Sequence, residues 1–388
     1  MKFSGLVGLF GHRQVGKTTL LEQLCNRYYT LDTKTEREQA ENHPAEYLAE
    51  RAGTWIGLDE CQSVPSLFPE LKDWVRRHKK PGQFLLSGSI RFTSKEAIRE
   101  SLTGRIINLE LLPFSVSELE NYPLPSFCYD VIEMENLDSI TGFQPRTNPE
   151  LRHMHARMIQ YFETGGLPGI CFIRDEKLRH QKINEQMNTM LDRDLRLVKK
   201  IQLPLGELRA ILTSLAGLQG KPLDYTRIKR ETGVSTPSIK KILYALEAIF
   251  LIRRIPIEGS TQGGTVFFED QAEHAFNSEQ KLTELEKLTH FCFTNLRSQF
   301  EYRLGETTQT FQYRTRGGAF IPLAFRNKRG CLGILPVTKS DQVQRVLGSV
   351  NSFLKAYSRS KVLIVHPEVK PPELIQPRAL SLPIGQII

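Results

Sequence analysis

Residues 11–19 read GHRQVGKTT and fit the pattern G-x-x-x-x-G-K-[ST]. Such a loop suits a polyphosphate, whose dense negative charge is best held by backbone amides. Glycine at positions 11 and 16 removes the Cβ atom that would block this approach and permits the unusual dihedrals of the loop. The helix after the loop points its positive N-terminal end at the same place. The pattern therefore predicts a loop that binds the phosphates of a nucleotide.

Two polar side chains of the loop have expected roles. Lys17 is expected to reach the β- and γ-phosphates, and the Thr18 hydroxyl is expected to hold Mg²⁺. The flanks agree, because LVGLF at residues 6–10 predicts a buried strand and the apolar stripe after the loop predicts a helix. The residues predicted to bind the nucleotide are Gly11, Gln14, Val15, Gly16, Lys17, Thr18 and Thr19.

An acidic pair follows the next short apolar stretch. Residues 56–58 predict a strand that ends in Asp59 and Glu60, and a doubly wound sheet binds its ligands at the carboxyl ends of the strands. Asp59 is expected to orient Mg²⁺ through water, and Glu60 to polarise the attacking water as general base. Downstream of a phosphate-binding loop, this pair indicates hydrolysis of a nucleoside triphosphate.

A further strand is predicted at residues 83–89, QFLLSGS, and it ends in small polar residues. Ser87 or Ser89 would there sense the γ-phosphate and the attacking water, although turn chemistry explains the same serines equally well. Arg105 follows Gly104, which closes a predicted helix. Its side chain is expected to reach a phosphate in its own or a neighbouring subunit, or to cap the helix. The candidate catalytic residues are thus Lys17, Glu60, Ser87 and Arg105.

The chain has 388 residues and a formal net charge of +9, unevenly distributed. The first 150 residues have an acidic excess, whereas residues 151–254 carry most of the basic excess. DNA and the acidic N-terminal domain of a neighbouring copy both fit such a surface. The six cysteines are scattered without C-x-x-C pairs, which indicates neither a zinc site nor a disulfide framework. With no bilayer-spanning run and no signal peptide, we expect a cytoplasmic protein without a membrane partner.

Five segments occur in a recognisable order: GHRQVGKTTLL, GLDECQSVPSLFPELK, FLLSGS, SLTGRI and LLPFSVSEL. They resemble the bacterial and archaeal AAA-superfamily ATPases whose C-terminal half is called domain of unknown function 4143. The resemblance covers most of residues 1–120 and implies ATP and Mg²⁺. YFETGGLPG at residues 161–169 is similar to the family's G-G-x-P element. Arg193 and Asp194 are similar to its R-D-L, where a structural ion pair is the expected role.

Residues 205–257 predict a winged helix-turn-helix. Two helices are followed by a turn, a longer helix with Ser235 as N-cap and Pro237 in its first turn, and a strand. Lys240 and Lys241 lie early on the longer helix, where a DNA-binding protein meets phosphates and base edges. Winged helices in this class of ATPase also serve as lids or oligomer contacts, so the sequence leaves the partner of this surface open.

From residue 258 the resemblance implies a fold similar to the PD-(D/E)xK nucleases. Members commonly have E-V-D-F on one strand and E-V-K on the next. Here Ile321 and Pro322 stand at the first position, and Pro336 and Thr338 stand where Glu and Lys would fall. Hydrolysis at such a site needs carboxylates that hold a metal ion. We therefore expect a degenerate module without nuclease activity.

These observations predict an α/β protein with a parallel sheet in its ATPase domain. The expected parts are a P-loop ATPase domain (1–120), an irregular linker (121–150), a helical and winged-helix domain (151–257) and a degenerate nuclease-like domain (258–388). One function is an ATPase whose nucleotide state moves the later modules on DNA. The alternative is a nucleotide-gated signalling or assembly module that works through protein partners and switches by homo-oligomerisation. An ATP-driven nuclease is disfavoured by the missing carboxylates, and GTP by the lack of an N-K-x-D motif.

Overall fold

The structure is a computed structural model that describes residues 4–91, 104–138, 146–199, 201–260, 263–303 and 307–388. The chain divides into two compact units, and each is built from three segments of the chain. The first comprises Met1–Leu112, Asn184–Leu205 and Lys240–Leu251, and the second Pro113–Ile183, Gly206–Ile239 and Ile252–Ile388. The domain boundaries proposed from the sequence are continuous ranges and stay predictions.

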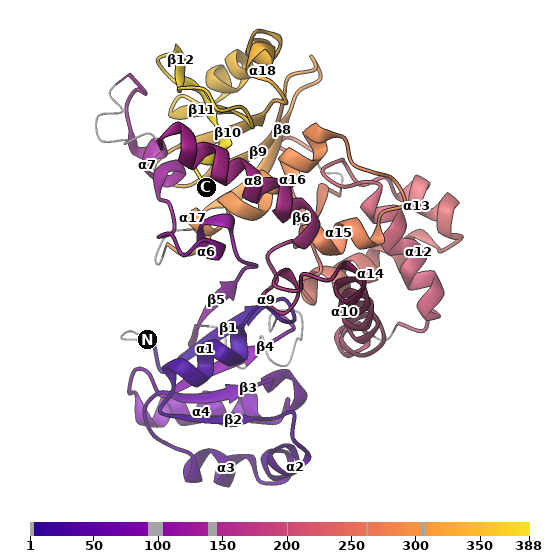
Figure 1. Ribbon diagram of the computed structural model, residues 1–388. Coiled ribbons are helices and arrows are strands. Elements are labelled where there is room, and N and C mark those ends of the chain that lie inside the picture. Colours follow the sequence, from indigo (N-terminus) through magenta and orange to yellow (C-terminus); the bar gives the residue numbers. More distant parts are fainter. Residues whose placement is uncertain (1–3, 92–103, 139–145, 200, 261–262, 304–306) are drawn as a thin grey trace. The chain divides into compact units, whose positions relative to one another are not determined.

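A sheet of five parallel strands forms the centre of the first unit, in the order β2-β3-β4-β1-β5 (Figure 1). Its strands are β1 (Leu6–Gly11), β2 (Arg27–Thr30), β3 (Ile56–Asp59), β4 (Phe84–Gly88) and β5 (Ile106–Leu111). The helices between them are α1 (Lys17–Leu24), α2 (Lys34–Asn42), α3 (Pro44–Glu50), the short η1 (Cys61–Ser63) and α4 (Leu67–His78). Phe10 pairs with Gly88 and Thr30 with Asp59, so the carboxyl ends of β1 to β4 meet at one edge.

Alternating side chains of these strands are buried on both faces of the sheet. Val7 and Leu9 of β1 pack with Leu21 of α1. Leu6 and Phe10 of the same strand pack on the opposite side in a cluster that includes residues of α3 and α4. Burial on both faces explains why the strands read as continuous apolar runs. The predicted strand, loop and helix are confirmed, whereas the helix expected before Gly104 falls on residues 92–103, outside the described part.

Two later segments complete the first unit. One contains the last residues of α10 (Glu176–Thr189), the one-turn π-helix η3 (Met190–Asp194) and α11 (Leu195–Val198). The other contains most of α14 (Thr236–Ala248) and Phe250, which is 2% exposed in the same core cluster as Leu6 and Phe10. The core of the five-stranded sheet therefore includes Phe250, a residue from far along the chain.

The second unit contains a mixed sheet of six strands, in the order β12-β13-β11-β10-β9-β8. Its strands are β8 (Gln309–Arg314), β9 (Phe320–Arg326), β10 (Cys331–Pro336), β11 (Ser360–His366), β12 (Glu373–Gln376) and β13 (Ala379–Pro383). β8, β9 and β10 form an antiparallel meander, whereas β10, β11 and β13 run parallel. A separate antiparallel pair joins β6 (Ile252–Ile255) to β7 (Thr265–Phe268).

Helices cover both faces of the six-stranded sheet. The helix α18 (Val343–Ala356) packs on one face, with Phe353 against Ile321 and Ile364 in one core cluster. The opposite face packs Leu323 and Ile334 in a cluster with residues of α7, α8, α16 and α17. The helices of this unit are α6 (Val116–Leu119), α7 (Phe127–Glu133), α8 (Asn148–Thr164), α9 (Pro168–Cys171), α12 (Leu205–Ala216), α13 (Tyr225–Thr232), α15 (Gln271–Asn277), α16 (Glu284–Leu296) and α17 (Ser298–Glu301), with short turns η4 (Ser340–Gln342) and η5 (Ile384–Gln386).

The sequence predicts an irregular linker over residues 121–150, whereas the structure has the helix α7 within it. Cys128, Val131 and Ile132 of α7 are buried in the core of the second unit. These apolar residues recur at helical spacing, but the surrounding prolines hide the pattern. In the described part of the chain, no helix combines the length and apolar character that crossing a membrane requires.

A glycine turn after α8 joins three parts of the second unit. Gly165 has φ +62°, and the amide of Gly166 donates to the Asp270 carboxylate at 2.7 Å. The Gly166 carbonyl accepts from the Phe114 amide at 2.8 Å, and Tyr161 donates to the Phe114 carbonyl at 2.9 Å. The predicted G-G-x-P element is thus the point where the end of α8, the segment before α6 and the start of α15 meet.

A methyl group at Gly166 should destabilise the second unit. It would overlap the Phe114 carbonyl oxygen and lie 2.6 Å from the Tyr161 hydroxyl. Overpacking of this kind typically costs about 1–3 kcal/mol, so we expect Gly166→Ala to lower the thermal unfolding midpoint. Gly348→Ala is the matched control. Its Cβ would meet nothing within 4 Å inside α18, so it should be neutral or stabilising by helix propensity. Equal midpoints for the two variants would contradict this account of the turn.

Candidate functional site

The loop between β1 and α1 has the backbone that its sequence requires. Gly16 is the N-cap of α1 with φ +99°, a left-handed conformation that favours glycine. Gln14 also has a positive φ of +59°. No atom lies within 4 Å of the place where a Cβ of Gly16 would stand. The loop therefore leaves open space beside its backbone at the start of α1, as an anion-binding loop requires.

Lys17 lies inside the loop rather than at its surface. Its residue exposure is 5%, and its ammonium donates to the carbonyl oxygens of Gly11 at 3.0 Å and His12 at 2.7 Å. Burial lowers the pKa of Lys17 to about 8, although the nearby carboxylates of Glu60 and Asp59 oppose the shift. A buried ammonium has little water to lose, so it is suited to pair with a phosphate group.

Asp59 at the end of β3 accepts hydrogen bonds from several elements. Its Oδ2 accepts from the hydroxyls of Thr18 at 2.7 Å and Tyr28 at 2.8 Å. Its Oδ1 accepts from the Ser87 hydroxyl and from the Glu60 amide. The carboxylate thereby connects α1, β2 and β4 around the loop. Burial and the bond to Asp59 raise the pKa of the Tyr28 phenol, which remains the donor.

Glu60 follows Asp59 in a left-handed conformation with φ +55°. Its carboxylate accepts from the side-chain amide of Gln62, which also donates to the Ser89 hydroxyl at 3.1 Å. Burial raises the pKa of Glu60, and the charge of Lys17 opposes this shift. A carboxylate with a raised pKa, held by an amide, is a suitable general base.

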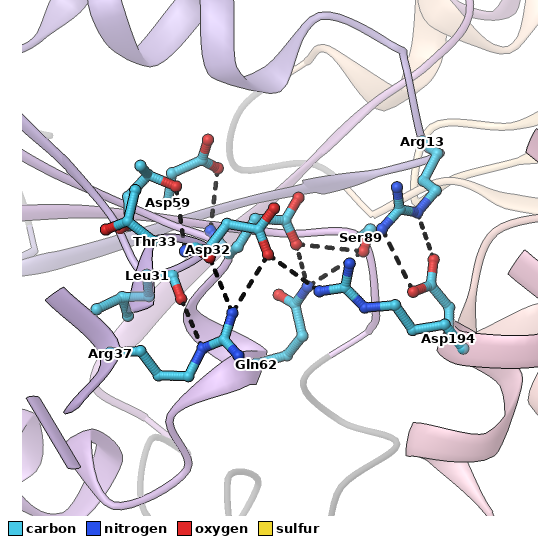
Figure 2. A network of polar contacts seen from close by, with 12 residues as sticks. Arg13, Leu31, Asp32, Thr33, Arg37, Asp59, Gln62, Ser89 and Asp194 are labelled. Atoms are coloured by element: carbon cyan, nitrogen blue, oxygen red, sulfur yellow. Dashed lines mark hydrogen bonds and ion pairs between the residues drawn. The ribbon is translucent and has the colours of Figure 1, made fainter. Parts of the chain in front are cut away.

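Two ion pairs from one later segment reach the same edge of the sheet (Figure 2). Arg13 of the loop donates to both oxygens of Asp194, with Nε–Oδ2 at 2.5 Å and Nη2–Oδ1 at 3.4 Å. Arg193 pairs with Asp32, which follows β2, at 3.0 Å. The sequence suggested an ion-pair role for Arg193 and Asp194, and the structure identifies their partners.

The structure brings most of the predicted site residues together. Hydrogen bonds connect Thr18, Asp59, Glu60 and Ser87, and Lys17 is hydrogen-bonded to the loop carbonyl of Gly11. The other predicted loop residues are Gln14, Val15, Gly16 and Thr19, at and beside the start of α1.

Arg105 lies elsewhere in the first unit. It precedes β5, which runs parallel to β1 with Ile106 beside Leu6, so Arg105 is at the amino edge of the sheet. The loop leaves the carboxyl edge, about 20 Å away along six residues of strand. The structure thus does not place Arg105 at the phosphate site of its own chain, and a role toward a neighbouring copy or in capping the preceding helix stays a prediction.

Sequence reasoning gave no role at the site to Tyr28, Gln62 or Arg13. Tyr28 lies in a predicted strand, but its contact with Asp59 depends on β2 pairing with β3, which local sequence does not show. Gln62 lies two residues after Glu60 in the stretch DECQ at residues 59–62, so its spacing from Glu60 was a usable signal. Arg13 gave no signal of its own because Asp194 is 181 positions away in the chain.

The oxygen atoms at this edge fit a magnesium ion. The Thr18 hydroxyl and the Asp59 carboxylate lie 2.7 Å apart, and Mg²⁺ prefers oxygen ligands from one or two side chains together with phosphate and water. The buried ammonium of Lys17 and the open backbone at Gly16 fit the phosphates. The residues present are therefore compatible with a nucleotide and its metal ion.

Comparisons with known proteins agree with this geometry. Residues 4–120 match a family described as AAA domain (AAA_14), and residues 155–258 match a family described as Domain of unknown function (DUF8612). The chain is similar to the uncharacterized proteins Mb2031c of Mycobacterium bovis and Rv2008c of Mycobacterium tuberculosis, each 25% identical over 252 residues. The matched part is 64% of this chain and 49% of each relative, so the chain spans about half the length of these curated relatives. The first match supports an AAA-like P-loop domain, and the second leaves the winged-helix and nuclease-like predictions without a test.

The burial of Lys17 should appear in the pH dependence of stability. Its folded pKa of about 8 lies below the ordinary 10.5, so its destabilising effect is full below pH 8 and disappears as pH rises to 10.5. The shift corresponds to roughly 3 kcal/mol at most, and its two hydrogen bonds offset part of it. We expect wild type to gain stability relative to Lys17→Met between pH 8 and 10.5, in thermal unfolding without nucleotide. Lys34→Met, at an exposed position of α2, is the control and should follow wild type at every pH.

Proposed function

We propose that the chain binds ATP with Mg²⁺ and hydrolyses it. The observation that carries the proposal is the Thr18 hydroxyl held at 2.7 Å by Asp59, beside the buried ammonium of Lys17. A hydroxyl at the start of the helix, a strand-end carboxylate and a loop lysine are the parts by which P-loop enzymes hold a nucleotide and its metal ion. The AAA match over residues 4–120 supports the same reading.

Each side chain then has a chemical role. The loop amides and Lys17 would hold the β- and γ-phosphates, and Thr18 and Asp59 would hold the metal ion. The ion, when bound, neutralises charge that develops on the phosphate oxygens. Glu60 would take the proton of the attacking water, and burial raises its pKa, which makes the carboxylate a stronger base. Gln62 orients the Glu60 carboxylate, and Ser87 orients Asp59.

Two substitutions should separate binding from turnover. Lys17→Ala removes the ammonium and should abolish ATP binding in calorimetry. Glu60→Gln keeps the size of the side chain and its polar contacts, so it should bind ATP and lose turnover by about 10²-fold or more in a phosphate-release assay. Glu41→Gln, the same substitution at an exposed position of α2, should leave turnover unchanged. Wild-type turnover in Glu60→Gln would place the base elsewhere.

The later modules are proposed to respond to the nucleotide. In chain order, α12, α13, α14 and the β6–β7 pair follow one another as in a winged helix. Lys240 and Lys241 are exposed on the second turn of α14, and Lys229 and Arg230 are exposed on α13. These cations support the proposal that the segment contacts the phosphates of DNA.

The C-terminal module is proposed to have a nuclease-like fold without nuclease chemistry. A helix, the meander β8–β9–β10, the helix α18 and the parallel strand β11 follow in the order expected for that fold. Ile321 and Pro322 are buried in β9, and Pro336 is buried at the end of β10. Buried apolar side chains at these positions supply no ligand for a metal ion, which supports an inactive module.

A second function is favoured by the place of Arg105. Because Arg105 lies at the opposite edge of the sheet from the loop of its own chain, an arginine that acts on the phosphate would have to act in a neighbouring copy. The chain would then be a nucleotide-gated assembly module that works without DNA. In that case the basic surface of α14 would dock on the acidic N-terminal part of the neighbour.

Charge reversal at Lys240 and Lys241 should distinguish the two functions. If this surface contacts DNA, replacing both residues with Glu should weaken binding to a labelled duplex in fluorescence anisotropy. The salt dependence should become shallower by roughly one per lost phosphate contact, and basal ATP turnover should persist. In the assembly module, the same variant would change the oligomer mass in light scattering and the ATPase rate. Lys79→Glu with Lys80→Glu makes an equal charge change after α4 and is the control.

A further inference from the structure

Arg13 lies at the third position of the phosphate-binding loop, and its side chain ends in an ion pair. Its guanidinium donates through Nε and Nη2 to the two oxygens of Asp194. The side chain of Arg13 is 27% exposed, whereas that of Asp194 is 3% exposed. The arginine therefore has solvent beside it into which it can move, but the carboxylate is fixed and buried.

Asp194 belongs to a segment with an irregular backbone. It is the last residue of the π-helix η3, between α10 and α11, and short π-helical turns are frequent at functional sites. Arg193 beside it forms a more exposed pair with Asp32, with side-chain exposures of 46% and 52%. Both ion pairs thus attach the segment to the nucleotide edge of the sheet, and the Arg13 pair attaches it to the loop itself.

Arg13 is also near the charges that face the end of the phosphate chain. Its positive charge is felt by both Lys17 and Glu60, and Asp194 in turn acts on Lys17. In the proposed site these residues lie where the γ-phosphate and the attacking water are placed. A γ-phosphate there would compete with Asp194 for the guanidinium, because both are anions that a fork of N–H groups binds. ADP has no group at this place.

We propose that Arg13 is a specificity-determining residue that recognises the γ-phosphate, and that Asp194 is the counter-ion it leaves when the triphosphate binds. ATP, but not ADP, would then separate η3 and α11 from the loop. The inference rests on the proposed ATP site and adds to it the discrimination between two nucleotides. Asp194 acts through Arg13 and is a positioning residue rather than a catalytic one.

The charge that each substitution removes determines whether nucleotide affinity should fall or rise. Arg13→Gln removes a cation that meets only the γ-phosphate, so it should weaken a non-hydrolysable ATP analogue about 10-fold or more and leave ADP within about 2-fold. Asp194→Asn removes the competing carboxylate, so it should tighten the analogue and leave ADP unchanged. Arg193→Gln alters the neighbouring exposed pair and is the matched control, expected to bind both nucleotides as wild type does.

Calorimetry with the analogue and with ADP, in Mg²⁺, measures these affinities on the full chain. Hydrogen exchange of the amides of Met190–Val198 supplies a second readout. In wild type the analogue should speed this exchange and ADP should not, and in Asp194→Asn exchange should be fast with either nucleotide or none. Arg13→Lys keeps the charge, so it should regain part of the preference for the analogue that Arg13→Gln loses. That result would also show that the loop tolerates substitution at this position.

Several results would overturn the inference. If Arg13→Gln weakens the analogue and ADP equally, or weakens neither, Arg13 does not read the γ-phosphate. If Asp194→Asn weakens the analogue as Arg13→Gln does, Asp194 holds the arginine in place for the phosphate and does not compete with it. Failure of wild type to bind either nucleotide would remove the ATP site itself, which separates that failure from a failure of the Arg13 role alone.

Discussion

The carboxylate of Asp59 is the constraint on which the arrangement of the candidate site depends. It accepts hydrogen bonds from Thr18 on α1, Tyr28 on β2 and Ser87 on β4, and from the amide of Glu60. Asp59 is 2% exposed. A buried carboxylate without such hydrogen-bond donors would destabilise the folded chain. The order β2-β3-β4-β1 of the parallel sheet makes this convergence possible, because β3 lies between the strands that supply Tyr28 and Ser87. The pairing of β3 with β2 and β4 therefore determines both the sheet and the arrangement of the candidate site.

The phosphate-binding loop and the residues beside it lower the stability of the first unit. The Lys17 ammonium is buried, and its lowered pKa is a measure of how unfavourable the charged form is in the folded chain. Gln14 and Glu60 have positive φ angles, which non-glycine residues adopt at some cost. Strain and desolvation thus gather where the proposed chemistry takes place, while the apolar clusters on both faces of the sheet supply the stability that permits them.

The sequence predicts the local parts of this site and fails at the distant ones. The loop, its strand and helix, and the Asp59–Glu60 pair were accessible because each is encoded within about ten consecutive residues whose spacing carries the chemistry. The partners of Arg13 and Asp59 were not accessible, because Asp194 lies 181 positions away and Tyr28 depends on strand pairing. For Arg105 the sequence left three roles open, and the parallel pairing of β5 with β1 argues against one of them, because it places Arg105 at the edge of the sheet opposite its own loop. The helix α7 was not predicted, because prolines on both sides of it obscure the spacing of its apolar residues.

The discontinuous build of the first unit gives the proposed nucleotide response a physical route. Arg91, three residues after β4, donates from its amide to the carbonyl of Ala248 and from Nε to that of Glu247, at the end of α14. Its guanidinium lies over the Phe250 ring at 4.3 Å, and Phe250 is part of the sheet's own core. The segment that follows the strand of Ser87 is therefore hydrogen-bonded to the end of the helix that carries Lys240 and Lys241. Since packed protein interiors transmit strain, this contact is the route by which the proposed nucleotide response would reach α14.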